Sequence, residues 1–377
     1  MNVAIFETGQ ASQIVAEIIE NNFNPWLESQ DVAPLKVVAY VSADKNLPFV
    51  SDNKAILHFE QYAALYRTKV IDKIILPREL FVGQTQIMSY LQLLGINVED
   101  ICLTGRLNQE IFPPNFIEFY LSAKYLPYLE FHVADHCNLN CKACEHYSGL
   151  VKEPHFPKLE KFTRDFERLH EFIDDIGMIR ILGGEPLLNP ELNEYIKLSR
   201  RLYPHAIIYV VTNAILLPKM PDSFFVTMRE CKAKFCISFY PPLVSKMPAI
   251  KRLLEAWGVD FWISPLNETF TMKQTLTPHN QISEMFLRCF QSHCHNLYEG
   301  KIAACFLPFT TKYFNASYGK NLPEDGALDL YSADLTTEKL KAHLLTPFER
   351  CRYCTPPVTV KWATIKEPSP ITDWVHS

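Results

Sequence analysis

Three cysteines stand close together in the middle of the chain, in the spacing C-x3-C-x2-C. They are Cys137, Cys141 and Cys144. Three thiolates so near one another can hold one face of a cubane iron–sulfur cluster. A closed structural metal site would require a fourth ligand. With only three local thiolates on a [4Fe–4S] cluster, one iron stays open to a small molecule, to which the cluster can pass one electron.

The same three cysteines have two other interpretations. His136 and His146 flank the motif, and thiolates with imidazole are a common zinc ligand set, so a zinc knuckle is the first alternative. Zinc sites, however, favour paired C-x2-C units. A set of buried free thiols without a metal is the second alternative.

A short glycine-rich element follows a predicted strand downstream of the cysteine motif. It consists of Gly183, Gly184, Glu185 and Pro186. The glycines allow another group to approach the backbone closely, and Glu185 can complement a cation. Taken alone, the element is more typical of a turn at a strand end, where Gly-Gly and Pro are common.

A second group of cysteines lies in the C-terminal part of the chain: Cys289, Cys294, Cys305, Cys351 and Cys354. Residues 297–304 predict a β-hairpin with Glu299-Gly300 at its turn. Cys305, Cys351 and Cys354 are three candidate ligands of a second cluster. The fourth is Cys289 or Cys294, and Cys294 lies nearer to the hairpin. A zinc site in this segment is the alternative.

The elements that would carry these residues alternate between strands and helices. Strands are predicted at 128–133, 178–182, 207–212, 235–239 and 259–263, and helices at 162–176, 191–202 and 249–257. Such alternation predicts an α/β fold with a parallel sheet, and the motifs stand directly after strands. The pattern favours a barrel or part of one, in which the chemistry lies at the carboxyl ends of the strands.

The cysteine motif followed by Gly-Gly-Glu-Pro resembles the radical SAM superfamily. The resemblance implies a partial (β/α)6, TIM-like barrel over residues 126–265. It implies reductive cleavage of S-adenosylmethionine (SAM) to a 5′-deoxyadenosyl radical, which removes hydrogen from a substrate. It also implies that the backbone of residues 183–186 binds the SAM amino group. Thr212-Asn213 and Ser238 would lie near SAM, although their side chains could equally bond to local backbone.

One position departs from the family pattern. Members often carry an aromatic residue just before the third cysteine, where it contacts adenine, whereas this chain has Ala143. The adenine contact must therefore come from elsewhere, and His146 and Tyr147 are the candidates.

The C-terminal cysteines resemble the twitch, or half-SPASM, extension of radical SAM enzymes. The resemblance rests on C-x10-G-x4-C over Cys289, Gly300 and Cys305, followed by C-x2-C at 351–354. It implies one auxiliary [4Fe–4S] cluster, and its spacing favours Cys289 as the fourth ligand. A full SPASM domain would carry more cysteines for a second auxiliary cluster, and this sequence lacks them.

Residues 1–112 predict a separate, Rossmann-like α/β domain with strands at 3–6, 36–41, 70–76 and 100–103. Pro113-Pro114 marks its end. A dinucleotide fingerprint would show G-x-G-x-x-G, but only Gly9 is present. The domain loosely resembles the front units of some nucleotide-sugar-modifying enzymes. We expect either a nucleotide or sugar-phosphate site near residues 8–12 or a purely structural role.

Composition limits the classes of partner. The chain of 377 residues has a net charge of −5, no apolar run of membrane-spanning length and no signal-peptide pattern. We therefore expect a cytoplasmic protein that binds neither nucleic acid nor membrane. Eleven cysteines in a reducing compartment indicate metal sites. Three domains are expected, at 1–112, at 125–275 for the core and at 280–377 for the Fe–S extension.

The expected activity is that of a radical SAM enzyme of oxidoreductase or isomerase type. The Rossmann-like domain and the single auxiliary cluster favour a sugar or nucleotide-linked sugar as the small-molecule substrate. A flavodoxin- or ferredoxin-type protein would supply the electron. Peptide maturation is the rival activity, although such enzymes often begin with a winged-helix domain and this chain begins with a strand. A zinc-stabilised binding protein is the rival without enzymatic activity.

Overall fold

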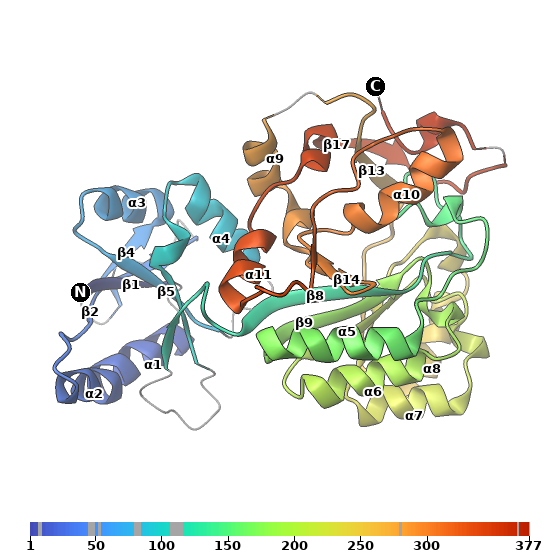
Figure 1. The fold of residues 1–377 in the computed structure, drawn as a ribbon. Coiled ribbons are helices and arrows are strands. Elements are labelled where there is room, and N and C mark those ends of the chain that lie inside the picture. The colour runs from blue at the N-terminus through green and yellow to red at the C-terminus, as the bar shows by residue number, and fades with distance from the viewer. Residues whose placement is uncertain are drawn as a thin grey trace. The chain divides into compact units, whose positions relative to one another are not determined.

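The fold is taken from a computed structural model of the chain. The structure describes residues 1–6, 10–43, 50–51, 54–78, 84–105, 116–278, 281–367 and 369–376. The chain divides into two compact units, Met1–Pro127 and Tyr128–Ser377 (Figure 1). The expected domain boundary at Pro113-Pro114 lies outside the described residues, as do Thr8 and Gly9 of the expected nucleotide site near residues 8–12.

The N-terminal unit contains a seven-stranded sheet in its described residues, ordered β3-β4-β2-β1-β5-β6-β7. The strands are β1 Asn2–Phe6, β2 Lys36–Ser42, β3 Val50–Ser51, β4 Lys54–His58, β5 Lys73–Leu76, β6 Ile101–Thr104 and β7 Ile117–Phe119. Strands β4, β2, β1, β5 and β6 are parallel, and the edge strands β3 and β7 are antiparallel to their neighbours. Counted along the chain, the parallel strands stand in the order 3-2-1-4-5.

Helices cover both faces of this sheet. They are α1 Gln10–Ile18, α2 Asn24–Ser29, α3 Phe59–Arg67 and α4 Gln84–Leu93 (Figure 1). All of Val3–Phe6 is buried, as expected of a parallel strand covered on both faces. The expected strands are present, but the third begins at Lys73 because Val70 still closes the turn after α3 through its bond to the Leu65 carbonyl. Strand β7 extends the sheet beyond residue 112.

The C-terminal unit contains an eight-stranded sheet in the described part of the chain, ordered β12-β11-β10-β9-β8-β14-β15-β16. The strands are β8 Tyr125–Ala134, β9 Asp175–Gly183, β10 Ile207–Thr212, β11 Lys234–Ile237, β12 Phe261–Ile263, β14 Asn296–Tyr298, β15 Lys301–Ala303 and β16 Ala327–Asp329. The pairs β9–β10, β10–β11 and β11–β12 are parallel. This is a mixed α/β arrangement whose parallel sheet is consistent with a partial barrel.

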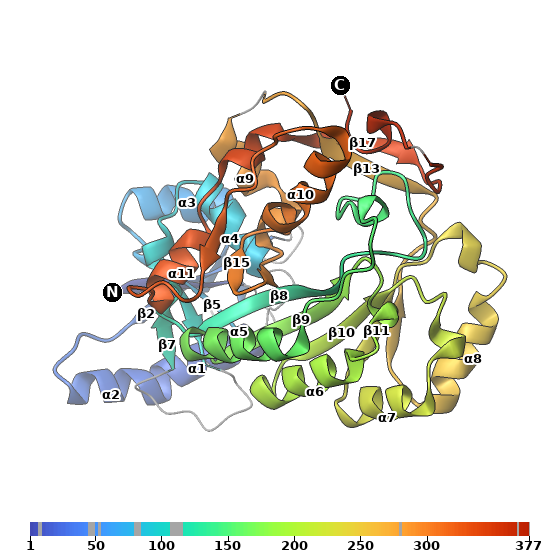
Figure 2. The same cartoon turned by 45° about the vertical axis from the view of Figure 1, so that its right-hand side comes forward.

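Four helices follow these strands and cover one face of the sheet (Figure 2). They are α5 Leu159–Phe172, α6 Leu192–Leu202, α7 Asp222–Glu230 and α8 Met247–Trp257. Helix α7 was not expected from the sequence, although Phe224 and Met228 recur at helical spacing and are buried. Ser238 was also expected in a strand, but β11 ends at Ile237 and Ser238 directly follows.

The C-terminal extension continues the same sheet. The hairpin predicted at 297–304 is confirmed: β14 and β15 are antiparallel, and Glu299-Gly300 form the turn with φ values of 50° and 79°. Strand β14 pairs in parallel with β8, so the hairpin is joined to the core. Strands β13 (Thr269–Gln274) and β17 (Cys354–Lys361) form a separate antiparallel pair.

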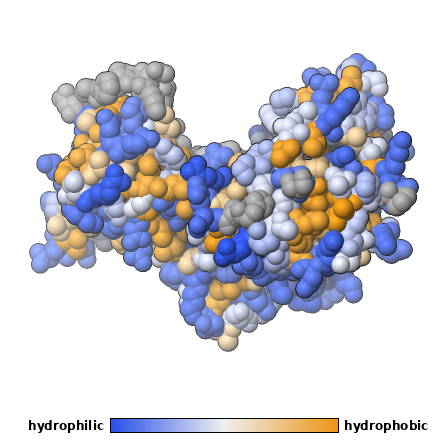
Figure 3. All heavy atoms as spheres, turned by 90° about the horizontal axis from the view of Figure 1, so that it is seen from above, coloured by the Kyte–Doolittle hydropathy of each residue, from blue (hydrophilic) through white to orange (hydrophobic). Residues whose placement is uncertain are grey.

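The extension also supplies helices α9 (Ile282–Arg288), α10 (Leu307–Tyr318) and α11 (Thr337–Leu344). Helices α9 and α10, with β13 and β17, lie across the sheet from α5–α8 (Figure 2). Among the described helices, none is both long and apolar enough to cross a membrane. Hydrophilic and hydrophobic side chains are interspersed over the face drawn in Figure 3.

Candidate active site

Cys137, Cys141 and Cys144 lie in the loop that follows β8. Cys141 is buried and the other two are half-buried. Burial raises the pKa of Cys137 and of Cys141 to about 12, and the neighbouring Cys144 charge acts in the same direction on both. The three thiols therefore lie within electrostatic reach of one another. They stay neutral unless a positively charged group compensates their thiolate forms.

The backbone of this loop is unusual. Asn140, Ala143 and Tyr147 have φ values of 49°, 59° and 55°, in the left-handed region that non-glycine residues seldom adopt. Such strained residues gather at functional sites, where the surrounding structure holds them. Ala143, the residue that departs from the family pattern, is one of the three. The loop is thus held in a specific shape around its cysteines.

Gly183 and Gly184 pack directly against the end of β8. The Gly184 N–H donates to the Ala134 carbonyl at 2.7 Å, and the Glu185 N–H donates to the His136 carbonyl at 3.1 Å. A Cβ on Gly183 would lie 2.1 Å from the Ala134 oxygen, and a Cβ on Gly184 would lie 2.1 Å from the His136 oxygen. The glycines are therefore required for the approach of two backbone segments.

Glu185 is fully buried and joins the ends of β9 and β10. Its Oε1 accepts from Thr212 Oγ1 at 2.6 Å and from the Leu187 N–H at 3.1 Å. Its Oε2 accepts from the Asn213 N–H at 2.9 Å. Burial raises the pKa of Glu185 to about 7, although these hydrogen bonds act in the opposite direction. Its carboxylate thus bonds within the protein, and Pro186 opens the turn that follows it.

Asn213 connects this edge to the cysteine loop. Its Nδ2 donates to Asn138 Oδ1 at 2.7 Å and lies 3.8 Å from Cys137 Sγ. The half-buried Ser238 is adjacent, since its N–H donates to the Thr212 carbonyl at 2.9 Å. The strand-end residues expected from the sequence therefore meet beside Cys137.

A cavity of about 500 Å³ opens beside Cys144, a size typical of ligand sites. Its lining includes Tyr128, Glu130, Cys144, Arg180, Tyr240 and Phe270. His146 also lines it, and burial lowers the pKa of His146 to about 3, so the ring is neutral. Tyr147, the other residue expected near adenine, is instead buried against Phe314 and Trp374.

A polar group that the sequence analysis missed lies within this cavity. Tyr128 donates its hydroxyl to Glu130 Oε2 at 2.6 Å, and Arg180 Nη1 lies 3.5 Å from the same hydroxyl. Arg180 Nη2 also contacts Cys236 Sγ at 3.1 Å. Burial raises the pKa of Glu130. The alternation of polar residues at 128, 130 and 132 along one strand was a readable signal for this face.

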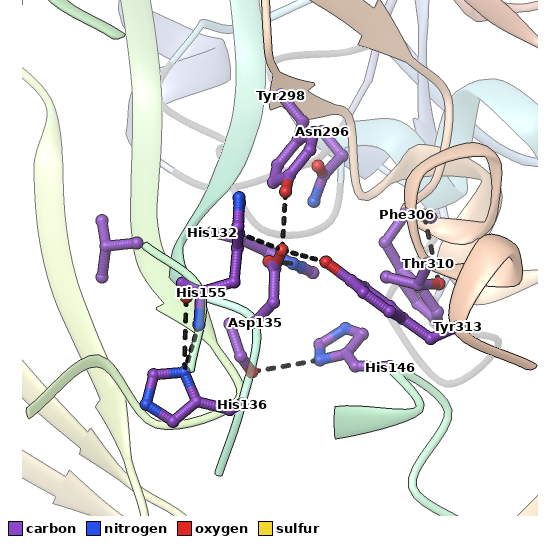
Figure 4. Close-up of polar contacts among 12 residues, drawn as sticks. His132, Asp135, His136, His146, His155, Asn296, Tyr298, Phe306, Thr310 and Tyr313 are labelled. Carbon is purple, nitrogen blue, oxygen red and sulfur yellow. Dashed lines mark hydrogen bonds and ion pairs between the residues drawn. The ribbon is translucent and has the colours of Figure 1, made fainter. Parts of the chain in front are cut away.

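Asp135, two residues before Cys137, is a second missed residue. Its carboxylate accepts hydrogen bonds from the hydroxyls of Tyr298, at 2.6 Å, and Tyr313, and lies 2.9 Å from His155 Nδ1 (Figure 4). His132 beside it and these hydroxyls hold the pKa of Asp135 well below its usual range, despite burial. Tyr298 lies on β14 and Tyr313 on α10, so Asp135 ties the cysteine loop to the extension.

The second cysteine group separates into two places. Cys289, Cys305, Cys351 and Cys354 line one small cavity beside α9. Burial raises the pKa of Cys305, Cys351 and Cys354, and the charge of Cys289 acts in the same direction on each. Cys294 lines the larger cavity beside Cys144 instead. Four of the five candidates are thus brought together.

Among the described residues, no three His, Cys, Asp or Glu side chains are placed to hold a single metal ion. The chemistry of the donors nevertheless fits iron–sulfur clusters. The loop after β8 presents three thiols, and the small cavity presents four. Thiolates are the ligands that hold such clusters, and buried thiols gain compensation for their charge when they bind iron.

A cysteine loop at the carboxyl edge of a parallel sheet, beside a ligand-sized cavity, is an arrangement typical of a cofactor-binding active site. Residues 132–228 match the model of the Radical SAM superfamily. This segment of the chain is therefore similar to radical SAM enzymes, and that family implies a [4Fe–4S] cluster and SAM as cofactors.

Curated relatives match a limited stretch of the chain. The GTP 3′,8-cyclase of Alkaliphilus oremlandii is 28% identical over 108 residues, which cover 27% of this chain and 32% of that protein. The 7,8-dihydro-6-hydroxymethylpterin dimethyltransferase of Methanocaldococcus jannaschii is 38% identical over 89 residues, which cover 22% of this chain and 17% of that protein. The chain thus spans about a third or less of the length of these relatives.

Two solved structures are similar to this chain over longer stretches than these relatives are. BtrN in complex with AdoMet and 2-DOIA covers 62% of this chain and 93% of its own, with 15% identity and a TM-score of 0.40. Native anSMEcpe with bound AdoMet and the Cp18Cys peptide covers 36% of this chain and 42% of its own, with 20% identity and a TM-score of 0.29.

Proposed function

We propose that Cys137, Cys141 and Cys144 hold a [4Fe–4S] cluster and that SAM binds in the cavity beside Cys144. One observation carries the proposal: hydrogen bonds join the cysteine loop, the Gly-Gly-Glu-Pro element and Thr212-Asn213. Cys144 of the loop, with Leu182 and Val211 directly before the other two elements, lines that cavity. When bound, the cluster supplies one electron that splits SAM into methionine and a 5′-deoxyadenosyl radical, which removes hydrogen from the substrate.

In this proposal the chain's own residues orient the cofactor and exclude water. The backbone of residues 183–186 binds the SAM amino group, with Glu185 as an internal brace rather than a direct contact. Asn213 and Ser238 lie toward the ribose. His146, being neutral and in the cavity wall, provides the ring against adenine that Ala143 does not. The parallel strands form the partial (β/α)6 barrel of the family around this cavity.

For the substrate we propose a sugar or a nucleotide-linked sugar. Tyr128, Glu130 and Arg180 present a donor, an acceptor and a cation in one cavity, a set that can bind the hydroxyl groups of a sugar. The strand order 3-2-1-4-5 of the N-terminal unit supports a Rossmann-like, nucleotide-binding origin. A flavodoxin- or ferredoxin-type protein is the proposed electron donor.

We propose further that Cys289, Cys305, Cys351 and Cys354 hold one auxiliary [4Fe–4S] cluster, as in a twitch extension. Their shared cavity supports this set, and Cys294 lines the cavity beside Cys144 instead. The expected domains, 1–112, 125–275 and 280–377, then correspond to a recognition module, the SAM core and the auxiliary-cluster extension.

Metal analysis and electron paramagnetic resonance (EPR) test this assignment. The protein is purified and reconstituted anaerobically, its iron, sulfide and zinc are measured, and dithionite-reduced spectra are recorded with and without SAM. The proposal predicts about eight irons per chain, the content of two cubanes, and one cluster signal that changes when SAM is added. A colourless protein that retains zinc through anaerobic purification and takes up no iron would favour the zinc-stabilised binding protein.

A further inference from the structure

The segment that leaves β17 lies along the cysteine loop. The Lys142 N–H donates to the Ala363 carbonyl at 2.7 Å, and the Ile365 N–H donates to the Asn140 carbonyl at 2.8 Å. Between them Cys141 forms an antiparallel bridge with Thr364. These backbone contacts hold residues 362–365, which we name the strap, in register with the middle cysteine of the motif.

The first residue of the strap contacts a thiol directly. Trp362 Nε1 lies 3.3 Å from Cys141 Sγ, and the indole N–H can only donate a hydrogen bond. This donor lowers the pKa of Cys141, against the larger effect of burial. Cys141 is 8% exposed, so water has little access to compete with the indole.

Trp362 is fixed through both its backbone and its ring. The backbone N–H of Trp362 donates to the Glu268 carbonyl at 2.9 Å, which continues the β13–β17 pairing. Its ring stacks on Tyr240, with centroids 5.9 Å apart and planes 18° from parallel. Tyr240 itself lines the cavity beside Cys144. A donor held in this way loses little freedom when it bonds to the sulfur.

From this geometry we infer that Trp362 is a positioning residue that sets the reduction potential of the SAM-binding cluster through Cys141. The inference rests on the proposed function. Hydrogen bonds to cluster sulfurs are among the features that set cluster potentials. Reduction adds negative charge to the cluster and its thiolates, so the indole N–H stabilises the reduced state more than the oxidised state. Removal of the indole N–H therefore makes the reduction potential of the cluster more negative.

The test is a potentiometric titration of reconstituted wild-type protein and the Trp362→Phe variant, followed by EPR. Phenylalanine keeps a ring against Tyr240 but has no N–H. The signal that responds to SAM should appear at a more negative potential in Trp362→Phe, with wild-type iron content. The second cluster's potential should not move. Trp262→Phe is the matched control, because Trp262 is 53% exposed on β12, and it should leave both potentials unchanged.

A second variant keeps the inference open to contradiction. Trp362→His retains a ring N–H, so its SAM-binding cluster should have a reduction potential between those of Trp362→Phe and wild type. Equal reduction potentials in wild type and Trp362→Phe, with iron intact, would overturn the role of Trp362 and leave the proposed function standing. Loss of this cluster's iron in both variants would also overturn it, because Trp362 would then only hold the loop. A wild-type protein without any SAM-responsive signal would instead contradict the proposed function.

Discussion

Asn213, directly after β10, and Cys137, in the loop after β8, face each other. The Asn213 amide nitrogen lies 3.8 Å from Cys137 Sγ and donates to the neighbouring Asn138 at 2.7 Å. Groups that orient metal ligands from the second layer commonly contribute a factor of 10 to 100 in affinity or activity. The contact therefore links the expected SAM side of the site to its first cysteine.

Asn213→Ala should lower the rate of 5′-deoxyadenosine formation about 10-fold or more, because the first cysteine and Asn138 lose their common partner. The rate is measured by chromatography under dithionite, together with iron content. Asn193→Ala, on helix α6, is the matched control and should behave as wild type. A rate equal to that of wild type in Asn213→Ala would refute this orienting role.

Gly184→Ala should destabilise the C-terminal unit by about 3 kcal/mol, the upper end of the usual cost of overpacking. The new Cβ would meet the His136 carbonyl, a backbone group that cannot rotate away. Urea unfolding gives the free energy. In Gly319→Ala a Cβ meets nothing within 4 Å, and only the left-handed backbone at φ 59° is strained, at roughly 1–2 kcal/mol. Equal losses in the two variants would show that the close approach is unimportant.

Stability should fall on acidification between pH 6.5 and about 4, in part through His293. Burial lowers the pKa of His293 from 6.5 to about 4, so below pH 6.5 the unfolded chain takes up a proton that the folded chain refuses. The shift corresponds to about 3 kcal/mol. His293→Gln should flatten the pH dependence measured by urea unfolding at pH 7.5 and pH 4.5. His205→Gln, at an exposed position, should leave it unchanged, and an equal slope in both variants would contradict the prediction.

Cys289→Ala should reduce the iron content from about eight to about four per chain, since it removes one of the four thiols around the small cavity. Cys294→Ala should keep both clusters, because Cys294 lines the larger cavity. Iron is counted in both variants after identical reconstitution. Loss of the second cluster in Cys294→Ala alone would reverse the assignment, and two clusters in both variants would mean that either thiol serves.

Local sequence patterns predicted most strands and the hairpin of the extension, because apolar periodicity and turn residues act over short stretches. They also placed the cysteine motif and residues 183–186 after adjacent strands. What they missed depends on contacts between distant residues. Trp362 meets Cys141 and Tyr298 meets Asp135 only because β17 and β14 lie beside the cysteine loop and β8. A short-range sequence pattern cannot predict such long-range contacts.

One role of the glycines could not be read from the sequence for a related reason. Gly-Gly at a strand end predicts close approach of some group, for which the sequence suggested SAM, and that contact stays a prediction. In the structure the backbone of Ala134 and His136 also approaches the glycines, which a single strand's pattern cannot reveal. The polar face of Tyr128 and Glu130, by contrast, was readable from its alternation along β8.

SAM cleavage by the triple variant Cys137→Ala, Cys141→Ala, Cys144→Ala tests the central claim most directly. Wild-type and variant proteins are reconstituted anaerobically, reduced with dithionite and incubated with SAM, and 5′-deoxyadenosine is quantified. Cys231→Ala, outside both cysteine groups, is the control and should match wild type. The account predicts 5′-deoxyadenosine from the wild type and none from the triple variant, which should remain folded with about half the iron. Formation of 5′-deoxyadenosine by the triple variant would contradict it.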